Sequence, residues 1–385
     1  MKTYHIYSSY TELPESWKPI TEHDIFLQTK YFEALEKSSP KNIQFFYVGI
    51  FNNGELVGIA VIQRVQLYLK DMFRQTKVSC LKTLVQDLVS KILKGNVLVV
   101  GNLTHTGQHG VFYQSNRITQ SEYLETIFKA LNELKNRIKK TQQKKIRAIM
   151  LKDFFEDDTI HSNKDFFIAQ KLHHVYVQPN MVMTVKKNWL KMDDYVASLN
   201  KKYRTRYNRA KKKLGKITCL ELDLKAIETH SEKLHQLYLN VSNNAKFNTF
   251  ILPQNHFYNL KLQLNDSFKV FGYYLDDELI GFYTLILNDD NLETYFLGYD
   301  TVHQYPNQLY LNMLYDMARF AIENKFSKIV YARTAMEIKS SVGAKPKTMS
   351  VYMKHTNGFI NAILKQVFKL MNPKQDWEER HPFKI

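Results

Sequence analysis

Alternating apolar and polar positions stand out in two long blocks of the chain. The first begins with FFYVGIFNNGELVGIAVIQ, from Phe45, and the second with FKVFGYYLDDELIGFYTLIL, from Phe268. In each block two apolar runs flank a short turn of Asn, Gly or Asp, which is typical of a β-hairpin. Both hairpins contain Glu-Leu, then Val or Ile, then glycine, so Gly58 and Gly281 take matching places. The pattern predicts two hairpins of one kind.

The segments after the two hairpins also match in kind and order. After the first come a strand pattern, a helical pattern and a second strand pattern: NVLVVGNL, SEYLETIFKALNELKNRIKK and IRAIML. After the second, the same order is LETYFLGYD, NQLYLNMLYDMARFAIENK and KIVYART. The second helix has one apolar stripe at three-to-four spacing, made of Leu311, Leu314, Ala318, Ala321 and Ile322. We therefore predict a duplicated α/β (mixed α+β) unit, each copy a mixed twisted sheet flanked by helices.

The repeat divides the chain into two domains. A join near 185–197 places the N-terminal domain at 1–190 and the C-terminal domain at 191–385, and each is long enough for its own core. The first copy carries an insertion at about 71–95, which contains the amphipathic segment LKTLVQDLVSKIL. A C-terminal helix is expected to pack on the second domain, with membrane contact as the alternative; its apolar face comprises Phe359, Ile363, Val367 and Leu370.

Composition narrows the class of protein. Hydrophobic residues make up 44% and charged residues 24% of the chain, as in ordinary globular proteins. The formal net charge is +17, which attracts polyanions such as nucleic acid, anionic lipid or phosphate-bearing cofactors. The chain has two cysteines and no Cys/His cluster at ligand spacing, so we expect neither a disulfide framework nor a metal. With no apolar signal region near its start and no run of membrane-spanning length, we expect a cytoplasmic protein.

A strongly basic segment lies at the join between the halves. KKYRTRYNRAKKKLGK, at 201–216, has nine Lys and Arg residues and no acidic one. An apolar stripe through Tyr203 and Tyr207 predicts a helix, placed at 194–215 with its flanking residues, that packs on one side and presents charge on the other. Its exposed arginines, with the two tyrosines to stack on bases, are candidates for anion or nucleic-acid binding: Arg204, Arg206 and Arg209. An ordinary interdomain helix with a solvated basic face remains the alternative.

Taken in order, several segments resemble the GNAT acyltransferase superfamily in its tandem form, found in Fem-type aminoacyltransferases of peptidoglycan synthesis and in BioF-like acetyltransferases. The segments are FLQTKYFEALEKSSP and VGIFNNGELVGIAVIQ in the first half, SLNKKYRTRYNRAKKKL at the join, and ELIGF, LGYD and RTAMEIKSSVGAKP in the second half. The resemblance covers nearly the whole chain. It implies two tandem GNAT-like domains.

The resemblance implies a donor site where a helix begins after the fourth strand of the second domain. In such a site the backbone N–H groups and the helix dipole hold the pyrophosphate of an acyl-CoA donor. The matching segment is QYPNQL, with Gln304 where the family has Arg or Gln, and Asn307 where it has glycine. Gln308 completes the candidate turn, and Leu309 stands where the family has a small residue. A helix N-terminus without a ligand is the plain alternative.

The resemblance also places the reacting groups where the fourth and fifth strands separate. Acyl transfer to an amine needs a base, an oxyanion donor and an acid for the leaving group. Glu337 is the candidate base, Tyr299 the candidate acid, and Lys339 or Arg333 the group that would hold phosphate or the oxyanion. For Glu337 and Arg333 the alternative is an ion pair at a strand end, and Lys345 is expected on the solvated surface.

These features favour an N-acyltransferase that moves an acyl group from acyl-CoA, such as acetyl-CoA, or a related carrier to an amine by direct attack. No covalent enzyme intermediate is expected, because neither cysteine lies in the motif region. A Fem-like aminoacyltransferase using aminoacyl-tRNA on a peptidoglycan precursor stays open, favoured by the altered phosphate turn and the +17 charge. A non-catalytic binding module for anionic precursors is the third hypothesis. The expected acceptor is a small-molecule or cell-wall-precursor amine, with tRNA and a membrane surface as further partners; the oligomeric state is open.

Overall fold

The computed structural model describes residues 2–67, 95–244, 248–371 and 377–384. The predicted insertion at 71–95 therefore lies outside the described residues, apart from Gly95. The chain forms two compact units. Unit 1 comprises Met1–Val177, Lys246–Ile251 and Thr348–Gln375, and unit 2 comprises Gln178–Ala245, Leu252–Lys347 and Asp376–Ile385.

Unit 1 is built on a mixed sheet with strand order β1-β2-β3-β4-β6-β13, and β5 also pairs with β3. Neighbouring strands are antiparallel except β4 and β6, which are parallel. The strands are β1 (Lys2–Tyr7), β2 (Ile43–Asn52), β3 (Glu55–Leu67), β4 (Gly95–Val100), β5 (Val111–Tyr113), β6 (Ile146–Phe155) and β13 (Lys345–His355).

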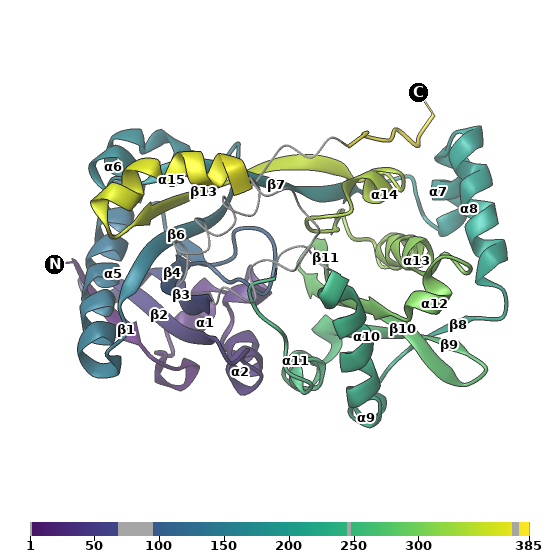
Figure 1. The fold of residues 1–385 in the computed structure, drawn as a ribbon, viewed down its shortest axis with the longest axis horizontal. Coiled ribbons are helices and arrows are strands. Elements are labelled where there is room, and N and C mark those ends of the chain that lie inside the picture. The colour runs from purple at the N-terminus through teal and green to yellow at the C-terminus, as the bar shows by residue number, and fades with distance from the viewer. Residues whose placement is uncertain (1, 68–94, 245–247, 372–376, 385) are drawn as a thin grey trace, which may run out of the picture. The chain divides into compact units, whose positions relative to one another are not determined.

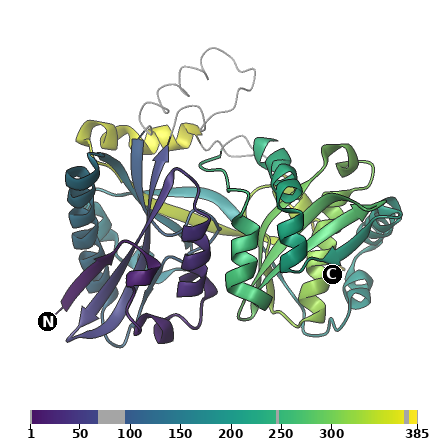
Figure 2. The ribbon, with the colours of Figure 1, turned by 90° about the horizontal axis from the view of Figure 1, so that it is seen from below.

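Helices cover both faces of the unit 1 sheet, as Figure 2 shows for α5 and α2. Phe46 and Val48 of β2 share a core with α5, whereas Tyr47, between them, contacts Trp17 and Phe32 on the other face. This alternation follows from the period of two along a strand. The helices are α1 (Trp17–Ile20), α2 (Thr29–Lys37), α5 (Gln120–Gln142), α6 (Lys164–Ala169) and α15 (Gly358–Met371), with the short turns η1 (Tyr10–Glu12), η2 (Ile25–Leu27) and η3 (Thr159–Ser162).

Unit 2 repeats the arrangement with the order β8-β9-β10-β11-β12-β7. Here too neighbouring strands are antiparallel except the fourth and fifth, β11 and β12. The strands are β7 (His173–Thr184), β8 (Thr218–Glu221), β9 (Phe268–Leu275), β10 (Glu278–Asn288), β11 (Asn291–Tyr299) and β12 (Lys328–Val330). The equal succession of strand directions confirms the mixed sheets predicted from the repeat.

The core of unit 2 lies between its sheet and α13, which is labelled in Figure 1. The predicted stripe on this helix is confirmed, because all of its five residues are buried in that core. On the other face of the sheet, Phe257 of α11 packs edge-on against Phe282 of β10. The helices are α7 (Met192–Ser198), α8 (Lys201–Leu214), α9 (Leu224–Thr229), α10 (Ser231–Asn244), α11 (His256–Leu264), α12 (Thr301–Gln304), α13 (Leu309–Glu323) and α14 (Met336–Ser340), with the turn η4 (Asn265–Ser267).

The two matching hairpins carry the same β-bulge. In β3, Gly58 pairs with Ile50 and Leu56 with Phe51, so Val57 is the extra residue. In β10, Ile280 is the extra residue, because Gly281 pairs with Tyr273 and Leu279 with Tyr274. A bulge turns a carbonyl out of the ladder, and each of these carbonyls accepts a hydrogen bond from the residue after a tyrosine: Val57 O from Gln114 N at 2.9 Å, and Ile280 O from Asp300 N at 2.8 Å. The shared sequence motif thus produces one shared backbone geometry.

The sixth strand of each sheet is supplied by the other half of the chain. β7 follows β6, yet its Val182–Thr184 part pairs with Lys328–Val330 of β12 in unit 2. β13 follows β12, yet it pairs with β6 in unit 1, with Met349 opposite Phe155. The units therefore interchange one strand each. The predicted division of the sequence into 1–190 and 191–385 stays a prediction.

The C-terminal helix follows the exchanged strand. The sequence places this helix in the second domain, whereas α15 belongs to unit 1. Leu364 lies with Val351 and Met353 of β13 in a small core. Phe359, which was expected on the packed face, is 79% exposed, whereas Ile363 of the same face packs against this core. The side chains of Val367 and Leu370 lie outside the described residues.

Candidate active site

In unit 2 the fourth and fifth strands run together for only a short distance. β11 and β12 pair over Asn291–Glu293 and Lys328–Val330. β11 then runs on through Thr294–Tyr299, while β12 ends at Val330. The exit of β12 and the end of β11 are the two places where the sequence predicts reacting groups.

The backbone leaves β12 in an unusual conformation. Ala332, Thr334 and Ala335 have positive φ angles of 58°, 66° and 47°. Left-handed backbone costs a non-glycine residue about 1–2 kcal/mol, and such residues cluster at functional sites. Reciprocal backbone bonds with Met181 of β7 anchor the start of this segment, at 2.8 Å from Tyr331 N and 3.2 Å to Ala332 O. The strained exit is thus held by the sheet itself.

Lys339, on α14, is buried inside this exit. Its ammonium Nζ donates to Arg333 O at 2.6 Å and to Ala332 O at 3.2 Å, and the residue is 5% exposed. Burial lowers the pKa of Lys339 to about 7, because removal from water disfavours the charged form. A lysine in this range exchanges its proton near neutral pH, which suits it to proton transfer or to binding developing negative charge.

Arg333 and Glu337 lie in the same loop but in different surroundings. Burial lowers the pKa of the Arg333 guanidinium to about 10. Glu337 instead has a side chain that is 53% exposed and forms an ion pair with Arg380 near the end of the chain. An ion pair at a strand end was the alternative for Glu337, and its partner in the structure is Arg380. Arg380 lay beyond any local motif, so spacing along the chain could not have found it.

Tyr299, at the end of β11, begins a row of tyrosines. Its ring centre lies 6.4 Å from that of Tyr310 on α13, and Tyr310 in turn acts with burial to raise the pKa of Tyr331. Burial, with the nearby Tyr305, raises the pKa of Tyr299. The Tyr299 hydroxyl therefore keeps its proton at neutral pH, as an acid must. The row leads from the end of β11 to the exit of β12. The sequence did not single out the partly buried Tyr310 or the buried Tyr331, because both resemble ordinary core aromatics.

Two side chains of the candidate phosphate turn already have hydrogen-bond partners in the backbone. The Gln304 side chain accepts a hydrogen bond from Tyr310 N at 2.9 Å, in the first turn of α13. Asn307 donates its side-chain amide to Lys213 O at 3.0 Å. Gln308 precedes the helix in left-handed conformation, with φ 51° and ψ 44°. The three predicted residues thus come together at the helix N-terminus, but Gln304 takes an amide that a phosphate would use.

The single helix predicted at 194–215 is two helices, α7 and α8, and the basic segment at 201–216 forms α8 and the two residues after it. The break comes at Asn200, whose side chain accepts from Tyr203 N at 3.3 Å and begins α8. Tyr203 is buried in the core of unit 2 and Tyr207 packs edge-on to Tyr315, with ring centres 4.9 Å apart. The expectation that Tyr203 stacks on bases is wrong, because its ring is buried, whereas the ring of Tyr207 is only partly buried.

The arginines of α8 remain at or near the surface. Arg209 is exposed, and Arg204 and Arg206 are partly exposed. Lys211 is different, since its ammonium donates to Asp316 of α13 at 2.7 Å. This pair, which the sequence did not suggest, fixes α8 against α13 and leaves the arginines as the charged face.

The described residues include neither a metal-binding cluster nor a membrane-spanning helix. No group of three or more His, Cys, Asp or Glu side chains there is placed to hold a metal ion. Within the same residues, every helix is too short or too polar to cross a bilayer.

Comparisons with known proteins identify the fold. No protein-family model matches the chain, and no curated protein sequence matches it. It is similar to a solved structure described as FemX, with TM-score 0.56 and 12% identity over 95% of this chain and 100% of that chain. It is also similar to a tandem GNAT protein from the clavulanic acid biosynthesis pathway, with TM-score 0.52 and 7% identity over 93% and 99% of the two chains. The resemblance read from the sequence is therefore confirmed at the level of the fold.

Proposed function

Because the chain has the tandem GNAT fold, we propose that it is an N-acyltransferase, which moves an acyl group from an activated donor to an amine by direct attack. The observation that carries the proposal is the state of Lys339, a buried lysine with a pKa of about 7. Within the described part of the chain, its ammonium group donates hydrogen bonds to backbone carbonyls only. Such a group is costly to bury. Its place at a strained strand exit supports a role in binding or proton transfer.

The proposed step uses the predicted residues in unequal roles. The amine attacks the acyl carbonyl, and the bond to the donor breaks as the new amide forms. Lys339, with Arg333, would stabilise the negative charge on the carbonyl oxygen or on donor phosphate. Tyr299 would protonate the leaving group, consistent with the raised pKa of its hydroxyl. Glu337 is retained as the base that takes the amine proton, although its ion pair with Arg380 must open for this.

Acyl-CoA is the first donor to test, and aminoacyl-tRNA is the second. One specific contact favours the second: the Gln304 side chain occupies the Tyr310 amide at the α13 N-terminus, where a CoA pyrophosphate would bind. The arginines of α8 offer tRNA phosphates an alternative charged surface. The acceptor in this second case would be a cell-wall-precursor amine, as in the Fem-like reading of the sequence. Under the third hypothesis, a non-catalytic binding module, anionic precursors bind without turnover.

The donor is tested by following the thermal midpoint during titration with acetyl-CoA, longer acyl-CoAs, aminoacyl-tRNA and deacylated tRNA. A donor present at about 100 times its Kd raises the free energy of unfolding by about 2.7 kcal/mol. Stabilisation by tRNA species but by no CoA species would replace the CoA reading with the aminoacyl one. Binding of either donor without transfer to any amine in a broad panel would favour the binding module.

The site is tested with Lys339→Ala in the assay that the titration selects. Loss of a group that binds transition-state charge lowers kcat by about 10²–10³-fold. Lys345→Ala is the matched control, since Lys345 lies in the same segment and is exposed, and it should retain full activity. Equal activity of the two variants would remove Lys339 from the mechanism.

The charged face of α8 is tested by replacing Arg204, Arg206 and Arg209 with Gln together. If the face binds tRNA phosphates, the slope of log affinity against log salt should become shallower by about 0.7–0.9 for each arginine that had neutralised a phosphate. An unchanged slope would assign α8 a structural role only.

A further inference from the structure

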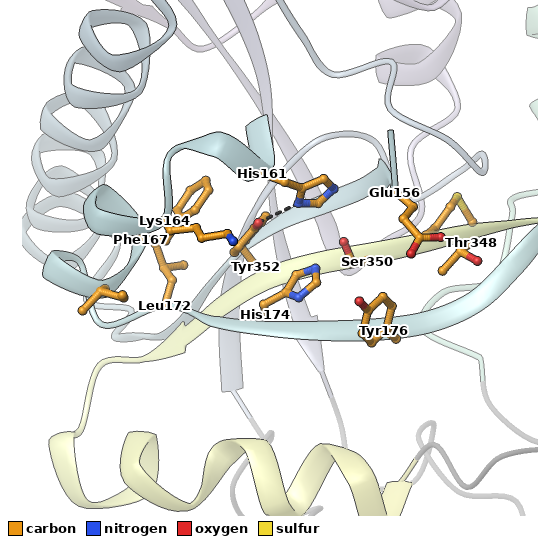
Figure 3. A pocket seen from close by; sticks show the side chains of 12 residues that line it. Glu156, His161, Lys164, Phe167, Leu172, His174, Tyr176, Thr348, Ser350 and Tyr352 are labelled. Carbon is orange, nitrogen blue, oxygen red and sulfur yellow. Dashed lines mark hydrogen bonds between the residues drawn. The ribbon is translucent and has the colours of Figure 1, made fainter. Parts of the chain in front are cut away.

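Unit 1 contains a pocket of about 470 Å³ that the proposed transfer chemistry does not use. This volume lies in the range of about 300–1,000 Å³ that is usual for small-molecule sites. The pocket is bounded by η3, α6, the first part of β7 and β13 (Figure 3). Twelve residues line it: Glu156, His161, Lys164, Phe167, Ile168, Leu172, His174, Tyr176, Thr348, Met349, Ser350 and Tyr352.

One wall of the pocket is flat and aromatic. Tyr352 stacks on Phe167, with ring centres 3.9 Å apart and an interplanar angle of 21°. His174 lies on Tyr352 at 5.0 Å, and Tyr176 meets His174 edge-on at 4.9 Å. Tyr176 is 56% exposed and therefore stands at the rim. A planar ligand can continue this stack, because aromatic rings prefer offset or edge contacts of this kind.

Both ring nitrogens of His161 have hydrogen-bond partners within the protein. Its Nε2 lies 2.8 Å from Phe155 O, and its Nδ1 lies 2.7 Å from the Tyr352 hydroxyl. A carbonyl oxygen only accepts, so Nε2 carries the proton, and in neutral His161 the Tyr352 hydroxyl donates to Nδ1. Both polar atoms of this pair are thereby satisfied. A ligand must find its hydrogen bonds elsewhere in the pocket.

Ser350 provides an unmet hydrogen-bonding group. The residue is 2% exposed, and its Oγ has no hydrogen-bond partner among the described residues. Figure 3 shows this oxygen pointing into the pocket between His174 and Glu156. A bulge in β6 lies opposite, since Ser350 pairs with Phe154 and Tyr352 with Leu151, and bulges commonly re-aim a side chain. A buried hydroxyl without a partner is unfavourable, so the pocket is built for an incoming polar atom.

Two residues of opposite charge line the pocket, one at each end. Lys164 reaches over it beside Phe167, whereas Glu156 lies at the far side near Thr348 (Figure 3). Among the described residues no ion pair is recorded for either. An anionic group is favoured beside Lys164, and Glu156 disfavours it at the other end.

We propose that this pocket binds a small aromatic carboxylate whose ring bears a hydroxyl or amino group. The ring would pack at the open end of the aromatic wall, against His174 and Tyr176. The carboxylate would lie at Lys164, and the ring substituent would bond Ser350 Oγ. All lining residues belong to unit 1, so the proposal stands whether or not unit 2 transfers acyl groups.

The ligand class is tested by calorimetric titration of the full chain with four probes: 4-hydroxybenzoate, 4-aminobenzoate, benzoate and cyclohexanecarboxylate. The two substituted benzoates should bind more tightly than benzoate by about fivefold, through one hydrogen bond. Cyclohexanecarboxylate should bind more weakly than benzoate by about fivefold, because it cannot stack. Absence of binding by every aromatic probe at concentrations up to about 10 mM, or equal affinities for all four probes, would overturn the proposal.

Two variants locate the ligand. Ser350→Ala should abolish the preference for 4-hydroxybenzoate over benzoate while leaving benzoate affinity unchanged. Lys164→Gln should weaken all carboxylates alike, and Lys139→Gln, an exposed lysine of α5, should weaken none. Ser350→Ala should also leave the thermal midpoint of the free protein unchanged or higher, since it removes an unpartnered buried hydroxyl. Unaltered probe preference in both variants would place any observed binding elsewhere.

Discussion

Each unit buries a lysine next to the end of its fifth strand, but the two lysines have different partners. Lys152 of unit 1 forms an ion pair with Asp153, which is 0% exposed, and donates to His105 O at 2.8 Å. Lys339 of unit 2 donates to two backbone carbonyls. Both lysines are 5% exposed. The same fold therefore pairs one buried lysine with a carboxylate, whereas no carboxylate among the described residues pairs with the other. This difference makes Lys339 the better candidate for chemistry.

The surroundings of the fourth and fifth strands also differ between the two units. In unit 1, β4 stays paired with β6 along Asn96–Val100, and a loop at 101–110 separates β4 from β5. This loop is packed with polar contacts, among them His109 Nδ1 to Asp24 Oδ2 at 2.7 Å and Gly107 N to Asp153 Oδ2 at 3.1 Å. In the described part of unit 2, β11 leads directly into α12 without such a loop, and beyond Glu293 it pairs with β10 but no longer with β12. Two copies of one fold can thus differ at the same place. In unit 1, polar side chains fill the space beside the end of the fourth strand, whereas in unit 2 the end of the fourth strand stays available for reacting groups.

The largest difference should appear when Lys152 is replaced. Lys152→Met leaves the Asp153 carboxylate buried without its ion pair, so the free energy of unfolding should fall by about 3–5 kcal/mol. Urea denaturation measures this loss. Lys152→Met with Asp153→Asn should recover part of it, because the uncompensated charge is gone. A loss below about 1 kcal/mol in the single variant would show that the pair is not buried in solution.

Replacement of Lys339 should instead change how the stability of the protein depends on pH. Its pKa is about 7 in the folded protein against 10.5 for an ordinary lysine, so the unfolded chain binds more protons between these values. Stability should therefore rise with pH in this window, by up to about 1.4 kcal/mol per pH unit from this group. Lys339→Met should remove that part of the rise, as urea denaturation at pH 6, 7, 8 and 9 would show. A parallel pH profile in the variant would mean that Lys339 is solvated.

Substitutions at the N-termini of α5 and α13 should change the stability by smaller amounts. α5 begins with a capping box formed by Thr119 and Glu122, and Thr119→Ala should cost about 1 kcal/mol. At α13 the cap is the Gln304 side chain on Tyr310 N. Gln304→Ala should cost a similar amount or less, and it should also free the amide for phosphate. CoA affinity that rises in Gln304→Ala would identify a latent pyrophosphate site, and unchanged affinity would argue against one.

The smallest effect is expected from Glu337. Its ion pair with Arg380 is at the surface, with 53% of the Glu337 side chain exposed, and exposed pairs contribute little to stability. Glu337→Gln should leave the thermal midpoint nearly unchanged. If Glu337 is the base, however, the variant loses turnover while it keeps donor affinity. Unaltered turnover would assign the carboxylate to the ion pair alone.

The sequence anticipated local features well where they depended on neighbours in the chain. The hairpins with Gly58 and Gly281, the long α5 and the stripe of α13 all follow from short-range periodicity and turn chemistry. The basic helix was recognised too, although the break at Asn200, which separates it from α7, was not. A single N-cap residue decided that break, and within a run of good helix formers its signal is weak.

The sequence by itself determined that one α/β unit occurs twice and that charge gathers between the copies, because these properties repeat or accumulate along the chain. Only the tertiary structure decided that β7 and β13 are exchanged between the sheets, that Lys339 is buried against carbonyls while Lys152 meets Asp153, and that Ser350 faces a pocket. Those outcomes depend on burial and on partners distant in sequence, such as Arg380 for Glu337, and burial is what changes the energy of a charge or a hydroxyl.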